Sequence, residues 1–134
     1  MKNIAIIAHD NLKPAASEFL KDKKDWIATV SLLATGRTAD YLEKSGVEIR
    51  HMSPGRSGGY RQIIDMVDSS EVDIVFFFMD PKVERPYHQD MEDLLDICIT
   101  KNIPVALNPE SAQLLILGMY KYESYLRHIS KKEN

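Results

Sequence analysis

Residues 73–81 read Asp-Ile-Val-Phe-Phe-Phe-Met-Asp-Pro, a nearly continuous apolar run that ends in a carboxylate and a proline. A run without polar alternation is typical of a strand covered on both faces of a parallel sheet. Pro81 disfavours helical geometry at the residue before it and ends the strand. We therefore expect Phe76, Phe77 and Phe78 in the core and Asp80 at the carboxyl end of a strand.

The same pattern, an apolar run followed by polar residues, recurs along the chain. Further strand-like runs cover residues 3–8, 29–34, 47–51 and 104–107. Segments with the helical period lie at 12–23, 37–45, 60–69, 88–101 and 110–117. This alternation predicts an α/β fold with a doubly wound, mostly parallel five-stranded sheet and helices on both faces. The 134 residues are 44% hydrophobic and contain no Gly/Ser/Pro-rich linker, so we expect a single domain, 1–134.

Composition and charge limit the partners. A net charge of −3 gives no overall attraction to nucleic acid, and we expect none as a partner. The single cysteine, Cys98, excludes an intrachain disulfide and lies on an apolar helical face, where it is expected to be a buried small hydrophobe. The chain has no 18-residue apolar segment and starts directly in a strand, so we expect no signal peptide, no membrane association and a cytoplasmic location.

Polar clusters follow four of the predicted strands and are expected to converge on one crevice, because ligands of parallel α/β sheets bind beyond the carboxyl ends of the strands. The clusters are His9-Asp10, Thr35-Gly36-Arg37-Thr38, Gly55-Arg56-Ser57-Gly58-Gly59 and Asp80-Pro81. Hydroxyls, a guanidinium and glycine-rich backbone are groups that bind phosphate. The composition therefore predicts a phosphate pocket with carboxylates nearby.

Each cluster also has a purely structural interpretation. Asp10 or Asn11 could cap a helix, and Thr35 could do the same for the next one. The glycines of 55–59 could mark only a flexible turn, and this loop matches neither a Walker loop nor the dinucleotide fingerprint. Asp80 could cap a backbone segment or form an ion pair. A carboxylate beside apolar walls can also have a raised pKa and act as an acid or base.

Taken together, these motifs resemble the methylglyoxal synthase family. The matching segments, in order, are Ala8-His9-Asp10-x-x-Lys13, Ala34-Thr35-Gly36-x-Thr38, Gly55-x-x-Gly58-Gly59-x-x-Gln62, Phe77-Phe78-x-Asp80-Pro81 and Asn102-Ile103-Pro104-Val105-Ala106-x-Asn108. The resemblance implies a homohexamer that converts dihydroxyacetone phosphate to methylglyoxal and inorganic phosphate with no metal or organic cofactor. A carboxylate removes the proton, and neighbouring donors stabilise the enediolate.

The resemblance also implies roles for individual residues. The residues that would hold the substrate, chiefly its phosphate, are His9, Lys13, Thr35, Gly36, Thr38 and Gly55. Asp10 and Asp80 would be site carboxylates, and Asp90 matches a further acidic position of the family. Arg37 and Pro54 stand at substrate-binding positions where the family has a threonine and a serine.

Two positions depart from the family pattern. The family's glycine loop ends in the proton-abstracting aspartate, whereas this chain has Tyr60 there. A phenol of ordinary pKa is neutral at pH 7 and is a donor rather than a ready base. The family's site histidine directly follows a proline, whereas here Tyr87 follows Pro86 and His88 comes one place later.

Two functions stay open at this point. The first is a divergent methylglyoxal synthase, a carbon–oxygen lyase in which Asp10, Asp80 or a shifted His88 takes over proton abstraction. The second is a catalytically weak or silent domain that binds a phosphorylated metabolite or inorganic phosphate. The related regulatory domain of carbamoyl phosphate synthetases is an example of such a binder.

Overall fold

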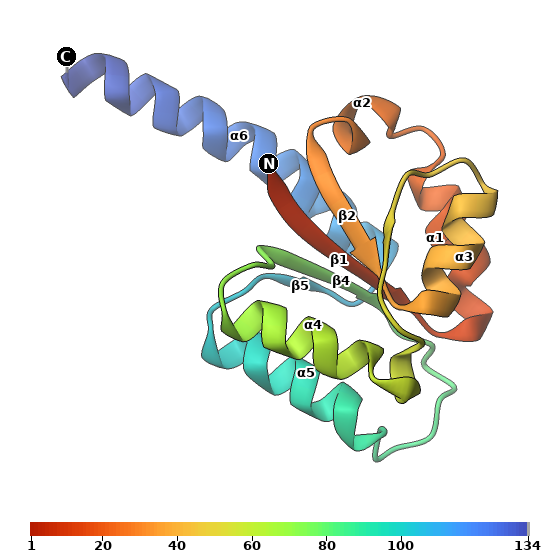
Figure 1. Cartoon of the computed structure of the whole chain (residues 1–134). Coiled ribbons are helices and arrows are strands. Elements are labelled where there is room, and N and C mark those ends of the chain that lie inside the picture. Colours follow the sequence, from red (N-terminus) through yellow and green to blue (C-terminus); the bar gives the residue numbers. More distant parts are fainter. Residues whose placement is uncertain (134) are drawn as a thin grey trace.

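The computed structural model describes the backbone of residues 1–133 and the side chains of residues 1–130, and it has a sheet between two layers of helices (Figure 1). The strand order in the sheet is β3-β2-β1-β4-β5, and all four pairings are parallel. The strands are β1 (Lys2–Ala8), β2 (Val30–Ala34), β3 (Arg50–His51), β4 (Ile74–Phe78) and β5 (Val105–Ala106). The predicted fold class is confirmed.

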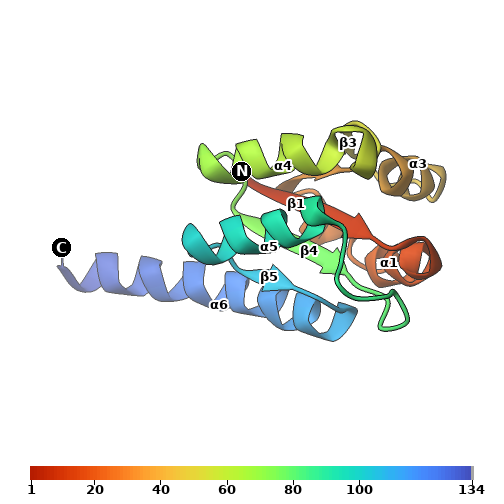
Figure 2. The same ribbon diagram turned by 90° about the horizontal axis from the view of Figure 1, so that it is seen from below.

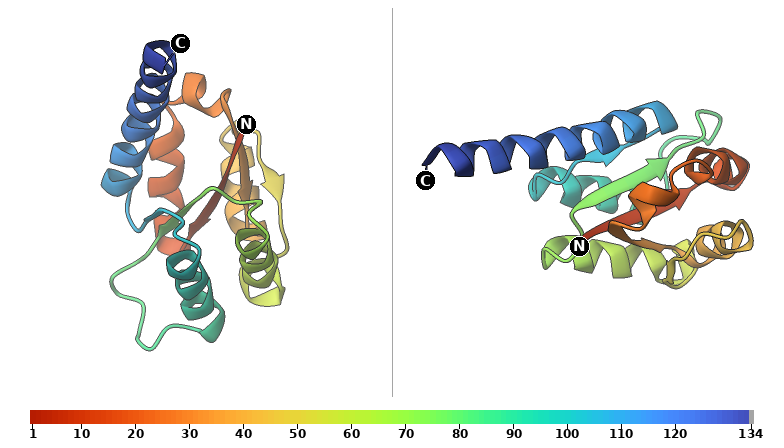
Figure 3. Two further views of the ribbon diagram at one scale, coloured as in Figure 1. Left: turned by 90° about the vertical axis from the view of Figure 1, so that its left-hand side faces the viewer. Right: turned by 90° about the horizontal axis from the view of Figure 1, so that it is seen from above.

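Helices cover both faces of the sheet (Figure 3). One core contains side chains of α1 (Lys13–Leu20), α2 (Lys24–Ile27), α3 (Gly36–Lys44) and α6 (Pro109–Glu133). The other core contains side chains of α4 (Gly59–Asp68) and α5 (Gln89–Thr100). Two single-turn 3-10 helices, η1 (Asp10–Leu12) and η2 (Gly55–Ser57), lie in the loops after β1 and β3.

The central strands are apolar throughout because successive side chains enter different cores. Ile4 and Ile6 of β1 belong to the first core, whereas Ile7 belongs to the second. In β4, Phe76 and Phe78 enter the first core and Phe77 enters the second, and all three are 1% exposed or less. This burial confirms the expectation for the three phenylalanines and explains why the run shows no polar alternation.

The structure differs from the sequence prediction at the edges of the sheet. β3 is confined to Arg50–His51, both exposed, because the preceding stretch offers the core only Ile49 as a buried side chain. α2 was not predicted and is anchored by one buried residue, Trp26. α6 runs past residue 117 and beyond the sheet (Figure 2), where its sequence is helix-forming but polar or exposed. Among residues 1–133, no helix is both long and apolar enough to cross a membrane.

Backbone hydrogen bonds tie the loops at the carboxyl end of the sheet to one another. The His9 N–H donates to the Phe78 carbonyl oxygen (3.1 Å), which joins the ends of β1 and β4. The Gly36 N–H donates to the Ser53 carbonyl oxygen (3.0 Å), which joins the start of α3 to the loop after β3. The segments that follow four strands are therefore held at one edge of the sheet.

Gly59, the first residue of α4, is packed against the turn that carries the glycine loop, and this packing can be tested. An added Cβ at Gly59 would overlap the Ser53 carbonyl oxygen and also approach Pro54, whereas an added Cβ at Gly118 in α6 meets nothing within 4 Å. We expect Gly59→Ala to lower the free energy of unfolding by about 2 kcal/mol or more, because backbone must shift. Gly118→Ala is the matched control. It should raise the free energy of unfolding by up to about 1 kcal/mol, because alanine is a better helix former than glycine. Urea unfolding measures both, and equal stabilities would contradict the packing described.

Candidate functional site

A pocket of about 600 Å³ opens at the carboxyl end of the sheet, between the four polar clusters. Side chains from all four clusters line it, as the sequence predicts. The lining residues are Ala8, His9, Asp10, Asn11, Lys13, Thr35, Arg37, Thr38, Pro54, Gly55, Arg56, Ser57, Tyr60, Asp80, Val83 and Met91.

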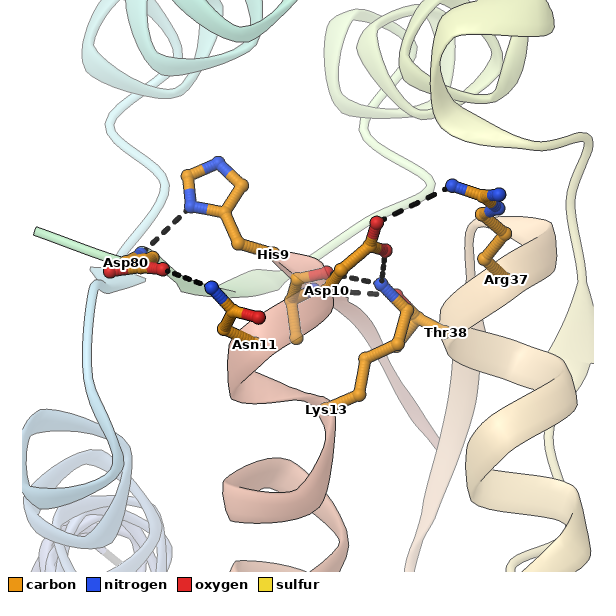
Figure 4. Close-up of polar contacts among 8 residues, drawn as sticks. His9, Asp10, Asn11, Lys13, Arg37, Thr38 and Asp80 are labelled. Atoms are coloured by element: carbon orange, nitrogen blue, oxygen red, sulfur yellow. Dashed lines mark hydrogen bonds and ion pairs between the residues drawn. The ribbon is translucent and has the colours of Figure 1, made fainter. Parts of the chain in front are cut away.

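His9 is held in one tautomer at the end of β1. The backbone N–H of Asp80 donates to His9 Nδ1 (2.8 Å), so Nδ1 is the acceptor and Nε2 carries the proton of the neutral ring (Figure 4). The side chain is 9% exposed, and burial lowers the pKa of His9, although Asp80 opposes this effect. His9 Nε2 is buried and has no hydrogen-bond partner among the described residues. His9 therefore offers a donor that a bound ligand could satisfy.

A cluster of charged side chains lies on the side of η1 away from His9 and Asp80 (Figure 4). Its members are Asp10, Lys13 and Arg37. The buried Lys13 Nζ donates to the Ala8 carbonyl oxygen and to Asp10 Oδ1, each at 2.8 Å. Arg37 Nη1 lies 3.4 Å from Asp10 Oδ2. The hydrogen bond and the charge of Lys13 lower the pKa of the Asp10 carboxyl, which is ionised at neutral pH. The exposed Arg37 and Asp10 side chains leave N–H groups and carboxylate oxygens open to a ligand.

Asp80 is a buried anchor, and its environment corrects the expectation of a raised pKa. The backbone N–H of Lys82 donates to Asp80 Oδ1 (2.9 Å), and Asn11 Nδ2 donates to Oδ2 (3.1 Å). These bonds, the backbone one first, lower the pKa of Asp80. The loop after Pro81 turns back and supplies the backbone donor, so the carboxylate is not left against apolar walls alone. Both of its oxygens are occupied within the protein.

Tyr60 lies in the first turn of α4, where its ring forms part of the second core. The ring stacks on Phe77 with centroids 6.1 Å apart and planes at 14°. An added Cβ at Gly55 would lie 2.7 Å from the Tyr60 ring, so the glycine loop fits closely over it. Burial raises the pKa of the Tyr60 phenol, with Arg56 acting in the opposite direction. The hydroxyl is therefore protonated at neutral pH and serves as a donor.

The threonines at the start of α3 are both buried. Thr38 Oγ1 accepts from the Ala8 N–H (3.4 Å), which connects α3 to the end of β1. Thr35 precedes α3 but makes no side-chain capping bond, and neither η1 nor α1 has a side-chain N-cap. Helix capping thus does not account for Thr35, Asp10 or Asn11. Gly36, whose N–H binds the neighbouring loop, does not line the pocket.

Besides Gly36, three residues assigned to the site by resemblance lie outside the pocket lining. Asp90 accepts from Arg61 Nε (2.9 Å) on the surface between α4 and α5. His88 is the N-cap of α5, and its Nδ1 accepts from the Asp90 N–H (3.2 Å). The Tyr87 hydroxyl accepts from the Arg85 Nε (3.0 Å). These three side chains thus do not line the pocket, although the charge of Asp90 contributes to the raised pKa of Tyr60.

Besides Ala8 at the end of β1, three lining residues were not predicted as part of the site. Asn11 was considered only as a helix cap, although it directly follows the first polar cluster. Met91 was assigned to an apolar helix face, and that face also forms a wall of the pocket. Val83 lies in the loop after Pro81 and gave no signal in the sequence. Among the side chains that the structure describes, those of residues 1–130, no group of three or more His, Cys, Asp or Glu is arranged to hold a metal ion.

The chain is similar to methylglyoxal synthases in sequence and in structure. A family model described as the MGS-like domain matches residues 17–107. The methylglyoxal synthase of Clostridium acetobutylicum is 34% identical over 129 residues, which span 96% of this chain and 89% of that protein. That of Carboxydothermus hydrogenoformans is 36% identical over 120 residues, 89% of this chain and 99% of the relative. The crystal structure of methylglyoxal synthase from Elizabethkingia anophelis NUHP1 matches with a TM-score of 0.79 and 30% sequence identity. The match covers 86% of this chain and 76% of that chain.

The chain belongs to the methylglyoxal synthase family. In this family member, the motifs after β1, β2, β3 and β4 all contribute residues to the pocket. The side of the pocket near η1 and α3 carries charge, and the side near α4 and α5 carries Tyr60 and Met91. Tyr60 thus lies in the pocket lining, whereas Tyr87 does not.

The buried neutral His9 predicts a pH dependence of stability. Its pKa in the folded protein lies below the ordinary 6.5, so below about pH 6.5 the unfolded chain binds a proton that the folded protein resists. The free energy of unfolding should therefore fall as the pH falls from about 7.5 to about 5.5. Asp10 and Asp80, with pKa values lowered from 3.8, titrate below this range.

His9→Asn isolates this contribution, because the asparagine oxygen can still accept from the Asp80 N–H. The decrease on acidification should be smaller in His9→Asn than in the wild type, measured by urea unfolding at the two pH values. His128→Asn, a change at an exposed residue of α6, is the control and should keep the full decrease. An identical decrease in all three proteins would rule out a buried neutral His9.

Proposed function

We propose that the pocket binds dihydroxyacetone phosphate and that the protein is a carbon–oxygen lyase that releases methylglyoxal and inorganic phosphate. The observation that carries the proposal is the convergence of three cations, Lys13, Arg37 and Arg56, with an unpartnered donor on His9 in one pocket. Guanidinium and ammonium groups bind the phosphate. Membership of the methylglyoxal synthase family supports the reaction.

Asp10 is the residue that we assign to proton abstraction. Both carboxylates among the described lining residues accept from donors of the protein, but Asp80 is buried, whereas the Asp10 side chain is 71% exposed and accessible to a substrate. Asp10 would take the proton from the hydroxymethyl carbon, and the electron pair would form the enediolate. His9 Nε2–H would donate to the enediolate oxygen. Cleavage of the carbon–oxygen bond to phosphate would then release inorganic phosphate.

The family resemblance supports further parts of the proposal. It favours a homohexameric assembly in the cytoplasm and a reaction without a metal or organic cofactor. Inorganic phosphate, as the second product, would occupy the same charged side of the pocket as the phosphate of the substrate.

The second candidate is a domain that binds the phosphorylated ligand without turnover. Tyr60 favours it, because a protonated phenol stands where the family resemblance assigns the base. In that case the charged side of the pocket is unchanged and only proton transfer is missing. The two candidates therefore predict the same ligand and different reactions.

Turnover of dihydroxyacetone phosphate separates the two candidates. We expect the wild type to release methylglyoxal and phosphate, and Asp10→Asn to be slower by a factor of about 10² or more, since it lacks the proton acceptor. Tyr60→Asp places a carboxylate where the resemblance assigns the base. Its turnover of dihydroxyacetone phosphate is the reference for the wild type. If neither the wild type nor Tyr60→Asp reacts while phosphate binds to both, the lyase proposal is wrong. Wild-type turnover comparable to that of Tyr60→Asp would rule out the silent binder.

The phosphate contact of Arg37 can be tested separately from turnover. Arg37→Gln should weaken binding of inorganic phosphate about tenfold or more, because a charge-assisted hydrogen bond is lost. Arg50→Gln, which changes an exposed arginine of β3 outside this pocket, is the matched control and should bind as the wild type does. Isothermal titration calorimetry measures both, and an unchanged affinity in Arg37→Gln would exclude the loop before α3 as the phosphate cradle.

A further inference from the structure

Helix α6 carries much of the exposed apolar surface of residues 1–130, and it runs past the edge of the sheet (Figure 1, Figure 2). Of the ten large apolar side chains that are exposed among these residues, six lie on this helix. They are Leu114, Leu117, Tyr120, Tyr122, Tyr125 and Leu126. The helix begins at Pro109, whereas the MGS-like family model matches residues 17–107. α6 therefore lies outside the family match, and its described residues do not line the pocket at the other end of the sheet.

The apolar residues of α6 have the spacing of a coiled-coil seam. Intervals of three and four residues alternate along one row, which consists of Ala112, Leu115, Met119, Tyr122, Leu126 and Ile129. The first three residues of this row pack in the core that α6 covers. Tyr122 and Leu126 continue the row but are 60% and 46% exposed, and neither belongs to a core of the described residues. The face of α6 that packs on the sheet thus continues into solvent.

The charges beside this apolar row favour a second α6 helix as its partner. Lys121, Glu123 and Arg127 are exposed on the projecting part of the helix. A helix that lies on a membrane surface has a predominantly basic polar face, whereas these charges have both signs. Glu123 and Arg127 are one turn apart on the same flank of the row. In an antiparallel pair of α6 helices, Glu123 of each copy comes close to Arg127 of the other, so the flank is complementary to itself.

A hollow of about 530 Å³ lies where α6 leaves the sheet. The residues that line it are Met1, Lys2, Trp26, Thr29, Val30, Asp73, Met119, Tyr120 and Glu123. Met119 is also a member of the apolar row, so the row adjoins the hollow. An antiparallel pair that sets Tyr122 opposite Leu126 of the second copy also sets Ile129 of the second copy opposite Met119. The end of each helix would therefore lie beside the hollow of the other copy.

We propose that two copies of this chain pair through the projecting part of α6, antiparallel and about a two-fold axis near Ser124. Each copy contributes the row from Met119 to Ile129, which is about 15 Å long at 1.5 Å per residue. Stable coiled-coil seams extend over three or more heptads, so a row of this length is too short to hold two copies by itself. The contacts of each helix end beside the hollow of the other copy are therefore part of the interface. This pairing uses no residue of the pocket and does not depend on the proposed function.

A charge in the middle of the row tests the pairing. Leu126→Glu places two carboxylates close to the two-fold axis, where they repel each other and lose the apolar contact. We expect the molar mass from multi-angle light scattering to fall at least about twofold relative to the wild type. Ser124→Glu adds the same charge on the opposite side of the helix and should keep the wild-type mass. Far-UV circular dichroism checks that both variants are folded.

Disulfide formation tests the antiparallel arrangement. Tyr125→Cys places one cysteine of each copy close to the axis, so mild oxidation should give a covalent dimer. Ile129→Cys is the matched control, because antiparallel helices hold the two residues 129 about 15 Å apart along the axis and no disulfide should form. Cys98 is buried, so the wild type should give no covalent dimer.

Three results would overturn the pairing. The first is an equal molar mass for the wild type, Leu126→Glu and Ser124→Glu. The second is a disulfide in Ile129→Cys but not in Tyr125→Cys, which would exclude the antiparallel arrangement. The third is a monomeric wild type that sediments with phosphatidylserine vesicles, which would assign the row to a membrane surface. Turnover and phosphate binding decide the proposed function separately, whichever of these results is obtained.

Discussion

The hydrogen bond from the Asp80 backbone N–H to His9 Nδ1 is the contact on which the site depends. It is buried, and together with the bond from the His9 N–H to Phe78 it joins the carboxyl ends of the two central strands. One bond thereby sets the spacing of two loops and the tautomer of the imidazole. Since Nδ1 is occupied as an acceptor, the proton has to reside on Nε2. The chemistry that the pocket offers at this point follows from the pairing of β1 with β4.

Much of this arrangement could be predicted from the sequence, for a physical reason. Apolar runs without alternation indicate parallel strands covered on both faces, and parallel strands end at one edge, so the convergence of the polar clusters follows from strand direction alone. The direction of the Asp80 pKa shift could not be predicted, because it depends on the Lys82 N–H, and loop geometry leaves no mark in the sequence. The short β3 and the buried Trp26 of α2 likewise depend on tertiary packing at an edge of the sheet.

The placement of Asp90 shows a different limit of sequence reasoning. The resemblance implies a site role for Asp90, but Arg61 binds both Asp90 and Asp93 between α4 and α5. His88, at the start of α5, is used as a helix cap. Spacing along the chain cannot reveal a competing partner on another helix. Tyr60 thus lines the pocket, whereas the adjacent Arg61 binds Asp90 outside the pocket lining.

Tyr60 also shows that the site and the second core are one packing unit. Its ring is 6% exposed, stacks on Phe77 and leaves no space for a side chain at Gly55. A carboxylate at position 60 would remove most of this apolar contact, and loss of a buried aromatic ring costs about 3–5 kcal/mol in typical cores. The neighbours of position 60 are thus fitted to an aromatic ring rather than to a small acidic side chain. Because Tyr60 also lines the pocket, the packing that stabilises α4 places a protonated phenol in this wall rather than a carboxylate.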